Sequence, residues 1–151
     1  ILGRPGHRIV NLQGDEPGVT GKWINSLVET PPGERRVSTL AAPLAEERAA
    51  DPSAVKVVFD RSGRAMYFSR SPIPHGGRTC YLHIGVYCFT PESLVFCAEC
   101  PGGTLAAQEN LEQLSWMENQ GGITVVPGNW NGLGVDTQQD LEEARKWFGN
   151  H

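Results

Sequence analysis

Hydrophobic and polar positions along this chain switch repeatedly between strand-like and helix-like spacing. Short apolar runs bounded by Gly, Pro or Asp are typical of strands. Six such runs are present, at residues 8–12, 37–44, 56–60, 65–69, 81–89 and 123–126. The first of them predicts a buried strand that ends in a polar turn.

Longer segments carry apolar residues at helical spacing. A periodic apolar face predicts helices over residues 20–29 and 105–119, and a last helix with Thr137 as its N-cap. Asp140 stands three residues after Thr137, which is a capping pattern. Pro91 predicts the start of another helix, because proline suits the first helical turn.

Strands and helices alternate, which predicts an α/β fold with a mixed, mostly parallel sheet. The runs at 56–60 and 65–69 are separated by a Gly-containing turn, so they predict an antiparallel hairpin that projects from the sheet. The length of 151 residues suits a single domain, residues 1–151, with its own core.

Composition narrows the function classes. The net charge of −4 argues against a broad nucleic-acid surface. No apolar run is long enough to cross a bilayer, so no membrane association is expected and the chain is interpreted as cytoplasmic. Because the chain starts at Ile1 rather than Met, the loss of a targeting segment remains an alternative. The four cysteines, Cys80, Cys88, Cys97 and Cys100, are interpreted as reduced, partly buried thiols rather than as a zinc or disulfide site.

Two acidic turns stand far apart in the sequence. Asp15 follows the first predicted strand, and Asp136 lies between an apolar run and the last helix. Ligands of open α/β sheets collect outside the carboxyl ends of strands. Magnesium is usually held by one or two protein carboxylates, with water and phosphate oxygens at the other positions. Asp15 and Asp136 are therefore the candidate metal ligands, provided that the two turns meet in space.

The string Gln-Gly-Asp-Glu-Pro at residues 13–17 is more specific than a lone aspartate. Together with further strings it resembles the family of the 3-deoxy-manno-octulosonate cytidylyltransferases, the CMP-Kdo synthetases. The other strings cover residues 51–58, 67–74 (Tyr-Phe-Ser-Arg-Ser-Pro-Ile-Pro), 83–87 (His-Ile-Gly-Val-Tyr), 111–114 and 134–137. The resemblance implies a nucleotidyltransferase-like, Rossmann-like sheet.

The resemblance also implies an activity: CTP and a 3-deoxy sugar acid would react to form CMP-Kdo and pyrophosphate, with Mg²⁺, for lipopolysaccharide or related cell-envelope polysaccharide synthesis. Asp15 and Asp136 are then the catalytic metal ligands, and Glu16 either orients a metal-bound water or caps its turn. The resemblance places the remaining substrate-binding side chains at Gln13, Arg70, His83, Tyr87, Glu112 and Gln113.

Other features leave alternatives open. Nothing matches the Gly-rich basic loop with which the family begins, so the chain is interpreted as a C-terminal portion without the N-terminal strands, inactive by itself. Leu82 and Ser115 stand where the family usually has basic residues, so a related sugar acid remains an alternative substrate. A non-catalytic module that keeps the fold and the dimer contact is a second alternative. A homodimer through the hairpin region is expected.

Overall fold

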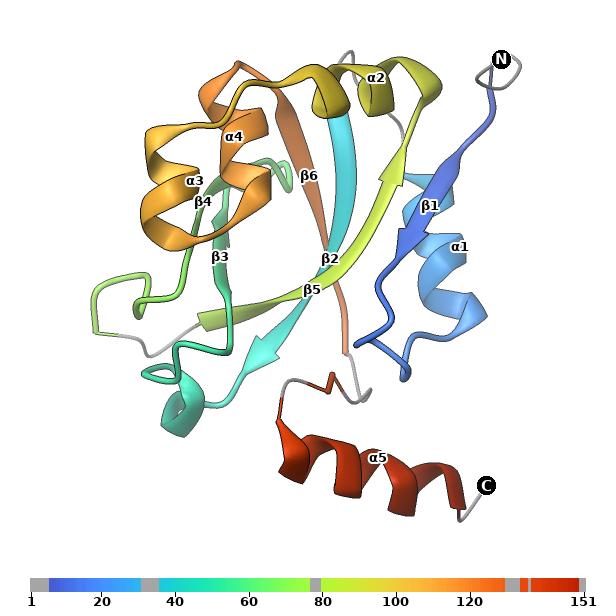
Figure 1. Cartoon of the computed structure of the whole chain (residues 1–151), viewed down its shortest axis with the longest axis vertical. Helices are drawn as coiled ribbons and strands as arrows, with labels where there is room; N and C mark the ends of the chain where they lie inside the picture. The colour runs from blue at the N-terminus through green and yellow to red at the C-terminus, as the bar shows by residue number, and fades with distance from the viewer. Residues whose placement is uncertain (1–5, 31–35, 77–79, 130–133, 136, 150–151) are drawn as a thin grey trace.

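The computed structural model describes residues 6–30, 36–76, 80–129, 134–135 and 137–149 (Figure 1). Its centre is a six-stranded sheet with the strand order β4-β3-β5-β2-β6, and β1 pairs with β5 beside this path. The strands are β1 (Ile9–Leu12), β2 (Arg36–Leu44), β3 (Lys56–Phe59), β4 (Ala65–Ser69), β5 (Cys80–Phe89) and β6 (Gly122–Pro127).

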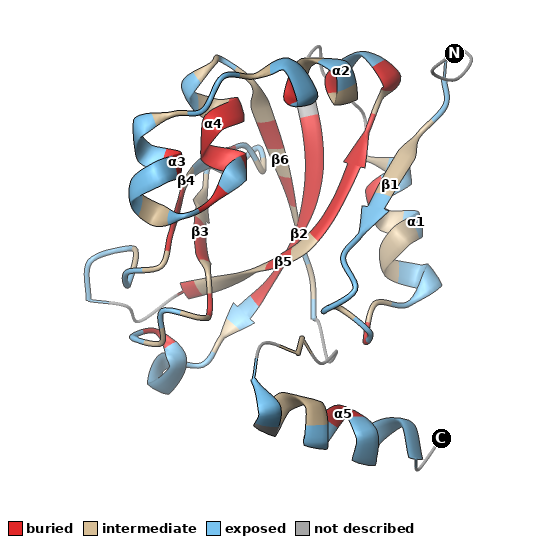
Figure 2. Ribbon diagram, in the orientation of Figure 1, coloured by how far each residue is buried: buried red, intermediate tan, exposed pale blue. Residues whose placement is uncertain are grey.

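Helices cover both faces of this sheet. They are α1 (Gly21–Glu29), the short 3-10 helix η1 (Glu46–Arg48), α2 (Pro91–Glu99), α3 (Thr104–Glu109), α4 (Glu112–Glu118) and α5 (Gln138–Gly149). In Figure 1, α1 lies on the opposite side of the sheet from α3 and α4, and α5 lies at one end of the molecule. Buried residues concentrate in β2 and β5 at the centre (Figure 2).

Two apolar clusters hold the layers together. Leu27 of α1 packs with Leu40 and Ile84 on one face of the sheet. On the other face, Leu114 and Trp116 of α4 join a larger cluster that contains several strand residues: Val37, Val57, Phe68, Tyr87, Phe89, Ile123 and Val125. Strands of a sheet covered on both faces read as nearly continuous apolar runs, which explains the pattern of β2 and β5.

The expected α/β fold with a mixed sheet is confirmed, but the expected excess of parallel pairs is wrong for the described strands. Only β2 and β6 run parallel there, while the β1–β5, β2–β5, β3–β4 and β3–β5 pairs are antiparallel. The turn between β3 and β4 is too short for anything but a hairpin, and short connections of this kind force antiparallel neighbours.

The hairpin does not project. Strand β3 pairs with β5 within the main sheet, and the β3–β4 turn folds back onto β6, where Val125 N donates to Gly63 O at 2.7 Å. Gly63 has a φ of +83°, and a Cβ at this position would lie 3.0 Å from Val125 O. Glycine is therefore required in this turn both for its backbone conformation and for the close approach of β6.

Two further expectations need correction. The single helix expected over residues 105–119 is two helices, because Asn110 adopts a left-handed conformation with φ of +53° and ends α3. Strand β1 is also less buried than expected: its last residue, Leu12, is 47% exposed. It lies outside the main strand path and shares only β5 as a neighbour, so half of its residues stay accessible.

The cysteines are buried as the sequence predicts. Cys80, Cys88 and Cys97 are buried and Cys100 is partly buried. Desolvation raises the pKa of the Cys97 thiol to about 12, so this thiol stays protonated at neutral pH. Within the described part of the chain, no helix is long and apolar enough to span a membrane.

Candidate active site

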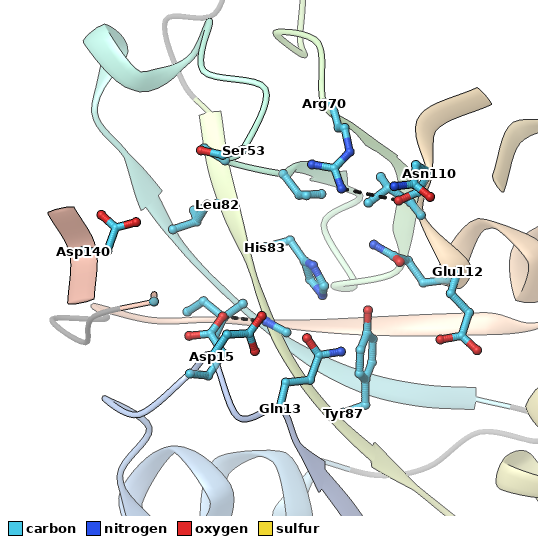
Figure 3. Close-up of a pocket in the computed structure, with 18 of the residues that line it drawn as sticks. Gln13, Asp15, Ser53, Arg70, Leu82, His83, Tyr87, Asn110, Glu112 and Asp140 are labelled. Carbon is cyan, nitrogen blue, oxygen red and sulfur yellow. Dashed lines mark hydrogen bonds between the residues drawn. The ribbon is translucent and has the colours of Figure 1, made fainter. Parts of the chain in front are cut away.

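The candidate site is a pocket at the middle of β5 (Figure 3). Strand β2 pairs along nearly the whole of β5, whereas β3 pairs only with its first residues and β1 only with its last. Since β2 occupies one edge of β5, β1 and β3 share the other edge and leave a gap between them. The residues of β5 that face this gap, around His83 and Gly85, are open to the pocket.

The first acidic turn lies over this gap. Glu16 Oε1 accepts a hydrogen bond from Gly85 N at 3.0 Å, so Glu16 caps the backbone that neither β1 nor β3 reaches. Gly85 also allows Gln13 to approach, because a Cβ at Gly85 would lie only 2.7 Å from Gln13 Oε1. Gln13 and the exposed Asp15 both line the pocket, as the sequence predicts.

The second acidic turn reaches the same place. Val135 N donates to the carbonyl oxygen of Asp15 at 2.8 Å, and Gly134 lines the pocket together with Asp15. Asp136, the other predicted metal ligand, lies outside the described residues. Its chain neighbour is nevertheless hydrogen-bonded to Asp15, so the turns at the two ends of the chain converge at residues 15 and 135.

Arg70 is held by backbone carbonyls at the opposite wall. Its Nε donates to Glu109 O at 2.9 Å, Nη1 donates to Pro52 O at 2.9 Å and Nη2 donates to Asn110 O at 3.4 Å (Figure 3). Three of its five N–H groups are therefore used for positioning. In the part of the chain that the structure describes, its other two N–H groups, one on each terminal nitrogen, have no partner.

Glu109, which the sequence did not single out, fixes the strand end that carries Arg70. One carboxylate oxygen accepts from Arg70 N at 2.8 Å, and the other accepts from Ser69 Oγ at 2.6 Å and from Tyr67 Oη at 3.4 Å. Desolvation tends to raise the pKa of the Glu109 carboxyl, but these hydrogen bonds outweigh it and leave the pKa below its usual value.

Lys56 is a second supporting residue that the sequence did not single out. Its side chain is fully buried, and its ammonium donates to Asp51 O at 2.8 Å and to Arg70 O. Burial lowers the pKa of Lys56. The ammonium thus ties β4 to the turn after η1, which contributes Ser53 and Ala54 to the pocket.

His83 and Tyr87 lie on one face of β5, as expected. The rings are 5.5 Å apart, and Phe68 packs edge-on against His83 with its ring centroid at 5.0 Å. Desolvation lowers the pKa of the half-buried His83 to about 3, so the imidazole is neutral at physiological pH. Burial also raises the pKa of Tyr87, with a smaller contribution from Glu112, and keeps the phenol protonated.

Helix α4 supplies the remaining predicted residues. Glu112 and Gln113 both line the pocket, from the first turn of this helix. Glu112 is exposed, whereas Gln113 is 4% exposed. The break at Asn110 places Glu112 at the start of a new helix, and the same break turns the carbonyls of Glu109 and Asn110 toward Arg70.

The pocket offers oxygen ligands for a hard cation. The carboxylates of Asp15 and Glu16 and the amide of Gln13 stand together at its rim, and Mg²⁺ binds through such oxygens. Three or more His, Cys, Asp or Glu side chains in metal-binding geometry are not found among the described residues. Mg²⁺ is usually held by one or two protein carboxylates, and the carboxylate of Asp15 fits that chemistry.

Comparison with known proteins identifies the family of this chain. A family model described as cytidylyltransferase matches residues 2–124. The chain belongs to the cytidylyltransferase family. Among its curated relatives, the 3-deoxy-manno-octulosonate cytidylyltransferase of Anaeromyxobacter sp. (strain Fw109-5) is 44% identical over 142 residues, and that of Anaeromyxobacter dehalogenans (strain 2CP-C) is 45% identical over 143 residues.

These matches cover 91% of this chain but 58% and 59% of the two relatives, so the chain spans about three fifths of their length. A solved structure of CMP:2-keto-3-deoxy-manno-octonic acid synthetase complexed with CTP superposes with a TM-score of 0.84 at 31% identity. The match covers 95% of this chain and 62% of the chain in that structure. The resemblance that the sequence motifs carry is thereby confirmed.

Two residues of the site that were not predicted, Lys56 and Gly85, nevertheless have a recognisable pattern in the sequence. Lys56 is a charged residue beside the apolar run Val57–Phe59, which indicates a buried cation that needs partners. Gly85 interrupts a long strand, and glycine inside a strand marks a close approach of another group. Glu109 carries no such signal, because its partner Ser69 lies 40 residues away in the chain.

Proposed function

We propose that this chain forms the sugar-acid and metal-binding part of a cytidylyltransferase that makes CMP-Kdo and pyrophosphate from CTP and 3-deoxy-manno-octulosonate. The observation that carries the proposal is the hydrogen bond between Val135 and Asp15, which joins the two acidic turns beside the β5 pocket. The names of the relatives support this choice of substrates. The product would serve lipopolysaccharide or related polysaccharide synthesis in the cytoplasm.

Each wall of the pocket has a part in the proposed reaction. Arg70 binds the carboxylate of the sugar acid through its two remaining N–H groups, since a guanidinium matches a carboxylate with two parallel hydrogen bonds. His83, Tyr87 and Gln13 bind sugar hydroxyls, and the α4 residues Glu112 and Gln113 complete that side. These contacts hold the attacking hydroxyl in line with the α-phosphate of CTP.

Asp15 and Asp136 are the proposed ligands of Mg²⁺. When bound, the ion neutralises charge that spreads over the phosphate oxygens as pyrophosphate leaves. The role of this chain is to set the ion's position relative to the sugar, and the Asp15–Val135 hydrogen bond fixes the two turns for that purpose. Glu16 has a structural role, because its carboxylate accepts a hydrogen bond from Gly85 N.

The direct test is a coupled assay of pyrophosphate release by the complete protein that contains this chain, with CTP, Mg²⁺ and a panel of sugar acids. We expect turnover with 3-deoxy-manno-octulosonate. Turnover with a different acid would favour the alternative substrate that Leu82 suggests, since this apolar side chain lines the pocket. Absence of turnover with any acid would contradict the proposal and leave a non-catalytic module.

A homodimer through the β3–β4 region belongs to the same proposal. Met66 on β4 is 64% exposed, and its strand lies at the end of the sheet order. An exposed apolar side chain on an edge strand is suited to contact with a second copy. Sedimentation of the complete protein at micromolar concentration should show a dimer, and Met66→Lys should weaken it; a wild-type monomer would contradict this assignment.

A further inference from the structure

The pairing of β2 with β5 is irregular beside His83. Thr39 pairs with Tyr87, but the next residue, Leu40, pairs with Ile84, so the register shifts at this point and β5 bulges at residues 85 and 86. Gly85 lies in this bulge, and on the other edge of β5 its N–H donates a hydrogen bond to Glu16. On the β2 side it brings the fully buried Thr39 hydroxyl close to three polar atoms of β5.

Those three atoms are two carbonyl oxygens and one imidazole nitrogen. Thr39 Oγ1 lies 2.9 Å from Val86 O, 3.2 Å from Ile84 O and 2.9 Å from His83 Nε2. A hydroxyl has one proton to donate, and a carbonyl oxygen can only accept. If the proton pointed at Nε2, the lone pairs of Oγ1 would face two carbonyl oxygens with no hydrogen between them.

The favourable arrangement sends the hydroxyl proton to the β5 carbonyls. Oγ1 then accepts a hydrogen bond, and His83 Nε2 must carry the proton that it donates. A neutral imidazole carries one proton, so Nδ1 becomes an acceptor. The contacts of the ring with Phe68 and Tyr87 oppose a rotation that would move Nε2 away from Thr39.

We propose that Thr39 is a positioning residue that holds His83 in the Nε2–H tautomer and thereby presents Nδ1 to the pocket as a hydrogen-bond acceptor. Within the described part of the chain, no group donates a hydrogen bond to Nδ1. The atom is thus suited to receive a hydroxyl proton of a polyhydroxylated substrate. The identity of that substrate as a sugar acid rests on the proposed function, whereas the tautomer does not.

The tautomer can be measured without any substrate. In the complete protein with ¹⁵N-labelled histidine, long-range ¹H–¹⁵N correlation spectra separate protonated from unprotonated ring nitrogens, and His83→Gln identifies the His83 signals. We expect a protonated Nε2 and an unprotonated Nδ1. A wild-type spectrum with the proton on Nδ1, or with both forms in similar amounts, would overturn the inference.

Thr39→Val tests the role of the hydroxyl, since valine keeps the branched shape and removes the donor and acceptor. We expect His83 to lose its single tautomer, and KM for the sugar acid to rise roughly tenfold, the effect of one hydrogen bond. KM for CTP should not change. Thr39→Ser, which keeps the hydroxyl, is the matched control and should restore both the spectrum and KM.

The outcomes separate the two proposals. If Thr39→Val leaves the tautomer signals unchanged, the inference is wrong whatever the enzyme does. If the tautomer shifts as expected but no sugar acid is turned over by the wild type, the inference about Thr39 stands and the proposed function fails. Should Thr39→Val not fold, the wild-type and Thr39→Ser spectra decide the matter, because both must show Nε2–H.

Discussion

Glu109 connects the break between α3 and α4 to the substrate side of the pocket, and Glu109→Gln isolates that connection. The carboxylate accepts from Arg70 N at 2.8 Å and from Ser69 Oγ at 2.6 Å. Glutamine keeps the shape but has only one acceptor oxygen, so its NH₂ group must face one of these donors. The variant therefore loses the charge-assisted hydrogen bonds to Ser69 and Arg70, because a neutral amide replaces the carboxylate.

The expected cost is about 2 kcal/mol of unfolding free energy, since hydrogen bonds to charged groups contribute about 1.5–3 kcal/mol. For a protein of this size class, that corresponds to a fall in Tm of roughly 4–8 °C. The Arg70 backbone also loses its anchor, so we expect KM for the sugar acid to rise roughly fivefold to tenfold, about 1–1.4 kcal/mol. KM for CTP should stay the same.

Urea unfolding, thermal unfolding and pyrophosphate-release kinetics measure these effects. Glu99→Gln on α2 is the matched control: it removes one carboxylate from an exposed position and should leave stability and both KM values unchanged. If Glu109→Gln were as stable as the wild type and had the same KM for the sugar acid, the carboxylate would not position Arg70 and this account of the pocket wall would be refuted.

Three other changes have definite expected outcomes. Gly85→Ala should change Tm little but raise KM for the sugar acid, because its Cβ displaces only the flexible Gln13 amide; an unchanged KM would contradict this. Lys56→Met should cost about 2 kcal/mol in urea unfolding, since two carbonyls lose a charged donor, and a stabilised variant would be evidence against that role. The pKa of His83 is about 3 in the folded state and about 6.5 in the unfolded state, so between these values the unfolded state binds a proton that the folded state does not. The free energy of unfolding should therefore fall as the pH drops from about 6.5 to about 3. The pH dependence of Tm should be weaker in His83→Gln, and an identical dependence would argue against a depressed pKa.

The starts of α2 and α5 were predicted correctly, because their signals lie within a few residues of each other in the sequence. The capping pair Thr137 and Asp140 forms reciprocal hydrogen bonds at the start of α5, and Pro91 opens α2 after the N-cap Thr90. The break at Asn110 was not predicted, because no glycine or proline marks it. It depends on tertiary contacts: the carboxylate of Glu109 binds Ser69 at the end of β4, and its carbonyl binds the next residue, Arg70, about 40 residues earlier in the chain.

The same distinction holds for the site. Motif residues such as Asp15, Arg70 and His83 were predicted, and the structure brings them to one pocket. The residues that orient them were missed. Thr39 meets His83 only because of the register shift between β2 and β5, and strand register across 44 residues cannot be read from spacing alone.

The most direct test of the account is a double-mutant cycle on magnesium-dependent pyrophosphate release by the complete protein. Asp15→Asn and Asp136→Asn should each reduce kcat by at least about a hundredfold, and the double variant should lose hardly more than either single one, because both side chains serve one ion. Near-normal turnover in either single variant, or losses that multiply in the double variant, would contradict a shared metal site at the meeting point of the two turns.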